Sequence, residues 1–133
     1  MDSDRKEIIY LERAKSELNL AKAIFKLCTH SKIKLELELK EDATSYSNVI
    51  GNSYYGVFYS AKVLLHSKNI ITEPPEEHKK TFEEFSKLAG KGIVDFELLK
   101  LYEKMLVKAE TLLGIFQLEK RKRAKFIYRT LPQ

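Results

Sequence analysis

Two tyrosines followed by a glycine mark the part of the sequence with the most apparent chemistry. Residues 52–65 read NSYYGVFYSAKVLL, an apolar run in which Tyr54 and Tyr55 precede Gly56. Neighbouring residues on a helix point about 100° apart, so these two rings cannot share one face. We interpret the pair mainly as packing or dimer-interface residues, because a buried tyrosine hydroxyl needs a partner. Direct contact with a nucleotide or an RNA base, by stacking, is the alternative.

One histidine, His78, follows two glutamates at the expected start of a short helix. Histidine is the side chain best suited to acid–base catalysis near neutral pH, which makes His78 the one candidate for a catalytic acid or base. No cysteine, serine or arginine stands at a spacing that would complete a catalytic set with it. The favoured interpretation is therefore a contact that ties the preceding loop to the core, and catalytic residues are otherwise unknown.

The C-terminal segment 119–133 carries all of the excess positive charge. It holds six lysines and arginines and one glutamate, which equals the net charge of +5 of the whole chain. Arg121, Arg123 and Lys125 are the candidates for binding phosphate groups of a nucleotide or RNA. Two aromatic residues, Phe126 and Tyr128, lie among them and suit base stacking. The alternative is a solvated helix end or a surface for an acidic protein, and a membrane-surface helix is the least favoured interpretation.

Other classes of site have little support in the sequence. The chain has one cysteine, Cys28, and three histidines without ligand spacing, so we expect no metal site and no disulfide. There is no glycine-rich phosphate loop, and no cofactor is expected. No apolar run reaches the roughly 20 residues of a membrane span, and no leader pattern is present, which together predict a cytoplasmic protein. We expect Cys28 to be buried, and His30 and His66 to lie on the surface.

Apolar residues spaced three and four apart predict a first long helix over about residues 3–29, with Ser3 as its N-cap. Its narrow apolar seam comprises Leu11, Ala14, Leu18, Ala21, Phe25 and Cys28. Residues 32–40, KIKLELELK, instead alternate between apolar and charged side chains, which is typical of a strand. Their composition favours a helix. Both an extended segment, paired with a second copy, and a helical or irregular linker remain open.

A second long helix is predicted to begin between residues 42 and 47 and to end near Asn69, and its small residues would let a neighbour approach closely. A short third helix is expected over about 75–89. A fourth should begin after an N-cap at Asp95 and end or bend at Gly114. These elements predict an all-α protein, an antiparallel up-and-down bundle of four to five helices, in a single domain spanning residues 1–133.

Two motifs in the predicted second and third helices resemble the HEPN superfamily. The first comprises Tyr54, Tyr55, Gly56, Phe58, Ala61, Leu64 and Leu65, and the second His78, Phe82 and Phe85. The tail KRKRAKFIY is similar to the segment that follows the third long helix in many members. The resemblance spans about residues 5–129. It implies a helical bundle that commonly forms a homodimer, and an association with nucleotides or RNA.

The resemblance also implies a partner protein, such as a minimal nucleotidyltransferase, in a toxin–antitoxin or defence module. Some members cleave RNA with an arginine followed after four to six residues by a histidine, and no arginine of this chain has such a histidine. We therefore expect a non-catalytic module, with a ribonuclease using other residues and a pure protein-interaction subunit as alternatives. Members with this kind of tail usually continue into another helix, so this chain is expected to be a short form or a fragment, or to complete its groove with a second copy.

Overall fold

The computed structural model describes residues 2–38, 40 and 46–116, and all regular elements in these ranges are helices. They are α1 (Asp2–Thr29), α2 (Ser31–Glu36), α3 (Tyr46–Ser67), α4 (Glu77–Gly90) and α5 (Phe96–Leu113). The prediction of an all-α bundle is confirmed. Among the described helices, none combines the length and apolar character that crossing a bilayer requires.

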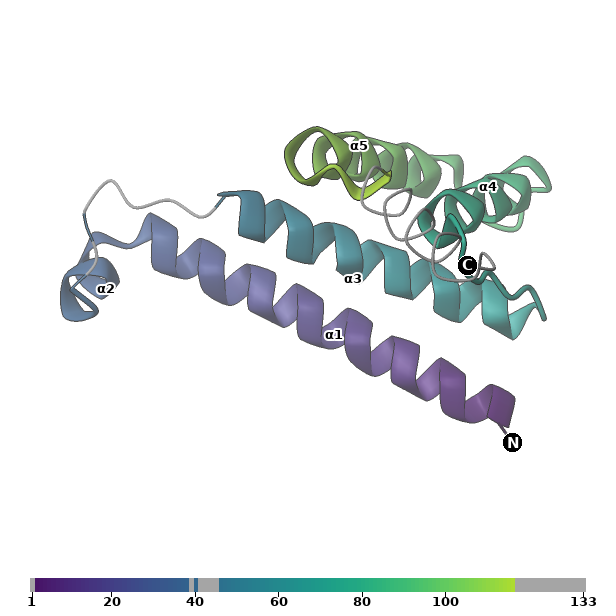
Figure 1. Ribbon diagram of the computed structural model, residues 1–133, viewed down its shortest axis with the longest axis horizontal. Coiled ribbons are helices and arrows are strands. Elements are labelled where there is room, and N and C mark those ends of the chain that lie inside the picture. Colours follow the sequence, from purple (N-terminus) through teal and green to yellow (C-terminus); the bar gives the residue numbers. More distant parts are fainter. Residues whose placement is uncertain (1, 39, 41–45, 117–133) are drawn as a thin grey trace, which may run out of the picture.

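Helix α3 is the centre of the described part of the molecule, because among the described helices it alone packs against α1, α4 and α5 (Figure 1). Tyr54, Phe58, Ala61 and Leu65 supply most of its contribution to the core. A helix with neighbours on several sides needs apolar residues around much of its circumference, as α3 has. The prediction of a long helix in the middle of a bundle is confirmed, although it ends at Ser67 rather than Asn69.

Helix α1 runs antiparallel to α3 and, within the described part of the chain, packs only against α3 and the short α2. Gly56 makes this approach close, because a Cβ atom placed there would lie 2.6 Å from the Cγ and Cδ2 atoms of Leu18. Of the predicted seam, only Ala14 and Ala21 are buried, whereas Leu11, Leu18 and Phe25 stay exposed. A single neighbouring helix covers only a narrow strip, so the larger seam residues flank the contact. The helix begins at Asp2, so Ser3 does not precede it as an N-cap.

The alternating segment after α1 is helical over Ser31–Glu36, so the extended interpretation is wrong for these residues. The helix stops at Leu37, and Glu38 adopts a left-handed conformation with φ of 58°. Lysine, leucine and glutamate favour a helix, and no strand among the described residues is available for pairing.

Helices α4 and α5 pack on the side of α3 opposite α1 (Figure 1). Helix α4 begins at Glu77, two residues later than predicted, and ends at Gly90. The side chain of Asp95 accepts a hydrogen bond from the amide of Glu97 at 3.0 Å, which confirms the predicted N-cap of α5. Gly114 ends α5 in the left-handed conformation with φ of 61°.

Candidate functional site

One ridge of α3 carries the most unusual side chains of the protein. Tyr54, Phe58, Lys62 and His66 follow one another at intervals of four residues, so they lie on one face of the helix. This ridge is enclosed by α1 on one side and by α4 on the other. Lys62, His66 and, from α4, His78 are all buried, and we refer to these three residues as the buried basic cluster. Buried bases are costly unless they are paired, so their partners define what the site can do.

His78 lies in an aromatic enclosure at the start of α4. Its Nδ1 atom lies 2.8 Å from the hydroxyl oxygen of Tyr54, at hydrogen-bond distance. Its ring stacks on Phe58 with 4.0 Å between centroids, and Tyr55 meets it edge-on at 5.6 Å. Only 9% of the residue is exposed. The expected contact between the start of α4 and the core is therefore present, and it is made with Tyr54.

Lys62 is 6% exposed, and its ammonium group has three kinds of partner. It donates to the carboxylate of Glu77 and, at 3.2 Å, to the carbonyl oxygen of Thr72. It also lies 4.6 Å from the centroid of the Tyr10 ring, a cation–π geometry. Helix α1, the loop before α4 and α4 itself thus converge on one charge from α3.

His66 is buried as well, which corrects the expectation that it lies on the surface. Its Nδ1 atom lies 3.1 Å from the Oε1 atom of Glu7, and its ring meets Tyr10 edge-on at 6.2 Å. The residue is near the end of α3, but the first turns of α1 lie beside that end (Figure 1) and place Glu7 and Tyr10 against it. Packing by α1 therefore decides the burial of His66.

Each member of the buried basic cluster contacts an acidic or hydroxyl group of another element. Glu7 and Glu77 are themselves about 30% exposed, so the cluster reaches the surface through its carboxylates. Within the described residues, no group of three or more histidine, cysteine, aspartate or glutamate side chains is arranged to hold a metal ion. The arrangement joins α1, α3 and α4 through these three bases.

The predicted site residues fall into two groups. Tyr54 is fully buried and Tyr55 is half-buried, with their rings 5.5 Å apart and edge to face. The packing role predicted for Tyr54 is therefore confirmed. The predicted binding residues Arg121, Arg123 and Lys125, with the rest of segment 119–133, lie outside the described residues. Cys28, expected to be buried, is half-buried.

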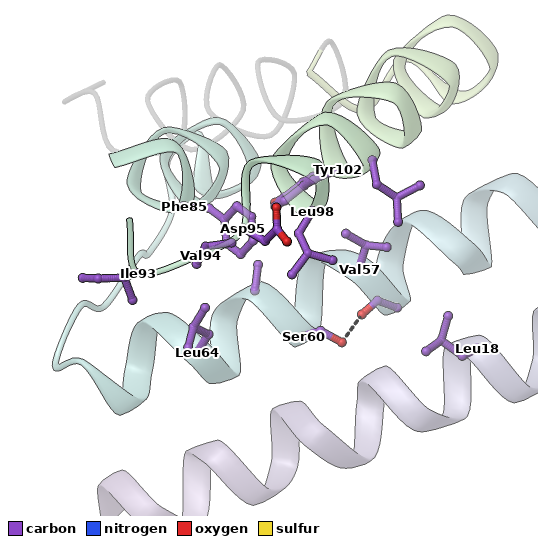
Figure 2. Close-up of a pocket in the computed structure, with 13 residues that line it drawn as sticks. Leu18, Val57, Ser60, Leu64, Phe85, Ile93, Val94, Asp95, Leu98 and Tyr102 are labelled. Atoms are coloured by element: carbon purple, nitrogen blue, oxygen red, sulfur yellow. Dashed lines mark hydrogen bonds between the residues drawn. The ribbon is translucent and has the colours of Figure 1, made fainter. Parts of the chain in front are cut away.

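A cavity of about 410 Å³ lies between α1, α3 and the start of α5, away from the buried basic cluster. Figure 2 shows Leu18 and Leu98 facing it from α1 and α5, with Val57, Ser60 and Leu64 of α3 between them. Its lining is almost wholly apolar. Tyr102 contributes to one wall, and its hydroxyl group has no hydrogen-bond partner among the described residues. Burial raises the pKa of this phenol well above its usual value.

Sequence reasoning missed Lys62 and His66. The signal was present, because both continue the four-residue spacing of Tyr54 and Phe58 into the enclosed part of the helix. A lysine in the apolar run SAKVLL is either solvated at the edge of the helix or buried with an acidic partner. Only the position of Glu77, fifteen residues away, decides between the two.

Comparisons of this chain with protein-family models, with curated proteins and with solved structures find no match.

Proposed function

We propose that this protein is a non-catalytic helical module of HEPN type that associates with a nucleotide or RNA through segment 119–133 and acts with a partner protein. The observation that carries the proposal is the charge distribution. The excess of five positive charges lies entirely in this short segment, together with two aromatic residues, and the other 118 residues are neutral overall. Such a segment suits contact with phosphates and bases.

Two features of the site support the HEPN resemblance and the absence of catalysis. The two motifs that carry the resemblance meet directly, through the contact between Tyr54 and His78. The same contact occupies Nδ1 of His78, and stacking on Phe58 encloses its ring. A general acid or base must come within hydrogen-bond reach of its substrate. An enclosed imidazole of this kind favours a structural role over ribonuclease activity.

RNA binding by the full chain tests the proposal. Fluorescence anisotropy of a labelled single-stranded RNA should show an association constant that falls steeply with salt, by a logarithmic slope of roughly −0.7 for each phosphate contact. The variant Arg121→Ala/Arg123→Ala/Lys125→Ala should reduce both affinity and slope. A matched control is Lys32→Ala/Lys79→Ala/Lys100→Ala, which removes the same charge from exposed lysines elsewhere.

Two results would contradict the proposal. Equal loss of RNA binding in both triple variants would mean that the segment has no special role, and absence of binding at low salt would remove the RNA association altogether. Cleavage of the RNA that disappears in His78→Gln, with the fold unchanged by circular dichroism, would instead favour a ribonuclease.

A pure protein-interaction subunit is the second candidate function, and a separate observation favours it. Many large apolar residues of α1 and α5 are about half exposed, including Leu11, Phe25, Leu98, Leu101 and Leu112. Exposed apolar residues that gather on a surface are typical of a protein interface.

A further inference from the structure

Helices α1 and α5, which flank α3 on opposite sides, each carry a stripe of mostly exposed residues that no other described helix covers. On α1 the stripe comprises Leu11, Lys15, Leu18, Lys22 and Phe25, and on α5 it comprises Leu98, Leu101, Met105, Lys108 and Leu112. We call these the α1 stripe and the α5 stripe. Leu18 of one and Leu98 and Leu101 of the other line the cavity of about 410 Å³. Leu18 and Leu98 face it from opposite sides (Figure 2), so the two stripes meet there as the walls of a groove over α3.

The spacing within both stripes is that of a helix-packing seam. Successive members are four, three, four and three residues apart on α1, and three, four, three and four apart on α5. Each stripe spans about 21 Å. Residues at this spacing form holes that accept the side chains of a neighbouring helix. Because the stripes extend well beyond the cavity at which they converge, a long occupant fits them better than a small molecule.

The two walls come together at the cavity, where one helix can contact both. Leu18 packs at Gly56, and Leu98 and Leu101 line the cavity beside Val57 and Leu64. The small residues Gly56 and Ser60 form part of the floor between the walls. A helix in this groove would complete a four-helix arrangement with α1, α3 and α5.

The charged residues of the two stripes indicate which kind of helix would bind between them. Seven of the ten stripe residues are apolar and the other three are lysines, Lys15, Lys22 and Lys108, all exposed. No stripe residue is acidic. The carboxylate of Asp95, which lines the cavity, caps the amide of Glu97. An apolar helix with acidic residues along its flanks would bury the leucines and pair with the lysines of both walls.

We infer that the groove between the α1 and α5 stripes is the docking site for an amphipathic helix of a partner protein, apolar on one face and flanked by aspartate or glutamate. This inference rests on the proposed function in one respect: it assigns a docking surface to the partner protein that the proposed function includes. It uses no residue of segment 119–133, so RNA binding and helix docking succeed or fail separately.

Two designed peptides test the inference with the full-length protein. Each is a fluorescein-labelled helix of about three heptads with leucine at the seam positions; one carries glutamate at the flanking positions and the other carries lysine. Titration followed by anisotropy should give the glutamate peptide an affinity at least about tenfold higher, because three flanking pairs become attractive instead of repulsive. Equal binding of both peptides, or binding of neither, would overturn the inference.

Substitutions then locate the binding site. Leu101→Glu should weaken the glutamate peptide at least about tenfold, whereas Val107→Glu, at a similarly exposed position on another face of α5, should leave it unchanged. Lys15→Glu/Lys22→Glu/Lys108→Glu should reverse the preference toward the lysine peptide, and Lys32→Glu/Lys79→Glu/Lys100→Glu should not. A preference that persists in the first triple variant places the binding elsewhere and contradicts the inference.

Sedimentation velocity tests whether a second copy of this chain, instead of a partner helix, occupies the groove. We expect Leu101→Glu to weaken peptide binding without changing the oligomeric state. A dimer that dissociates in Leu101→Glu, and that the glutamate peptide does not disrupt, would assign the groove to a second copy and overturn the inference.

Discussion

At the scale of single residues, the central feature is a lysine held inside the protein. Lys62 donates to Glu77 and to the carbonyl oxygen of Thr72, and its ammonium group faces the Tyr10 ring. Removing a charge from water costs several kcal/mol, which its partner repays only when the geometry is retained. The interaction is therefore more informative as a determinant of how α1, α3 and α4 fit together than as a source of net stability.

Breaking this pair from one side should destabilise the protein strongly. Glu77→Gln should lower the free energy of unfolding by about 3 kcal/mol, because it leaves the buried ammonium without its carboxylate. Lys62→Met/Glu77→Gln should recover a large part of that loss, since no charge is then buried. Urea denaturation measures both, and Lys87→Met, which removes an exposed pair with Glu84, should change stability by less than about 1 kcal/mol. A double variant less stable than Glu77→Gln would contradict this account.

The buried phenol of Tyr102 should make the protein less stable in alkali. Burial raises its pKa in the folded state, so above about pH 10 the unfolded chain loses this proton while the folded protein retains it. This contribution to stability is complete below the pKa of the unfolded chain and is lost as the pH rises, by up to about 1.4 kcal/mol per pH unit. Tyr102→Phe should reduce the slope by that amount in urea denaturation from pH 9 to 12.

The same substitution has a second expected result at pH 7. The Tyr102 hydroxyl has no hydrogen-bond partner among the described residues, so its removal should leave stability unchanged or raise it by about 1 kcal/mol. A loss above about 1 kcal/mol would show that this hydroxyl has a partner. Tyr46→Phe, at an exposed tyrosine, serves as the control for both measurements.

At the scale of helices, close approach at Gly56 determines how α1 lies on α3. The Leu18 side chain occupies the space in which a Cβ atom at position 56 would lie. Glycine costs about 1 kcal/mol in a helix interior. Packing of α1 therefore outweighs helix propensity at this position.

Larger residues at position 56 should separate the two helices. Gly56→Val should lower the free energy of unfolding by about 2 kcal/mol through overpacking, and Leu18→Ala should restore much of that loss when the two are combined. Gly51→Ala is the matched comparison, because its Cβ atom meets only the end of the exposed Leu113 side chain. It should leave stability unchanged or raise it by up to about 1 kcal/mol. Thermal unfolding of the four variants gives the coupling, and additive effects at positions 18 and 56 would contradict the account.

At the scale of the whole molecule, the two sides of α3 differ in how firmly they are covered. Helices α4 and α5 pack against each other as well as against α3, whereas α1 contacts only α3 and α2 in the described part of the chain. The first half of α1 is also held by Glu7 and Tyr10, which contact the buried basic cluster. Its second half has no comparable polar contact to α3 and leaves Leu20 and Phe25 half exposed.

The rate of amide hydrogen exchange should follow these differences in packing. Amides in the second half of α1 and in α2 should exchange faster than those in the first half of α1, and the middle of α3 should exchange slowest, because local opening exposes the least packed elements first. Mass spectrometry of the native protein measures this. Addition of the glutamate peptide described above should slow exchange in α1 and α5, if the groove between them is occupied. Equal protection along α1 would contradict the expected order.

The local sequence determined the four longer helices, their approximate bounds, the N-cap at Asp95 and the end of α5 at Gly114. These follow from apolar spacing and from terminal residues, which act over one or two turns. It also indicated the close approach at Gly56. The pairings of Lys62 with Glu77 and of His66 with Glu7, across fifteen and fifty-nine residues, came only from the tertiary structure. A basic residue on the apolar face of a helix is buried only where another helix places an acidic residue beside it. The local sequence does not show which helix does so. Residues 31–36 show a similar dependence on the rest of the molecule. Their alternating pattern suggested a strand, but the described residues include no strand with which it could pair.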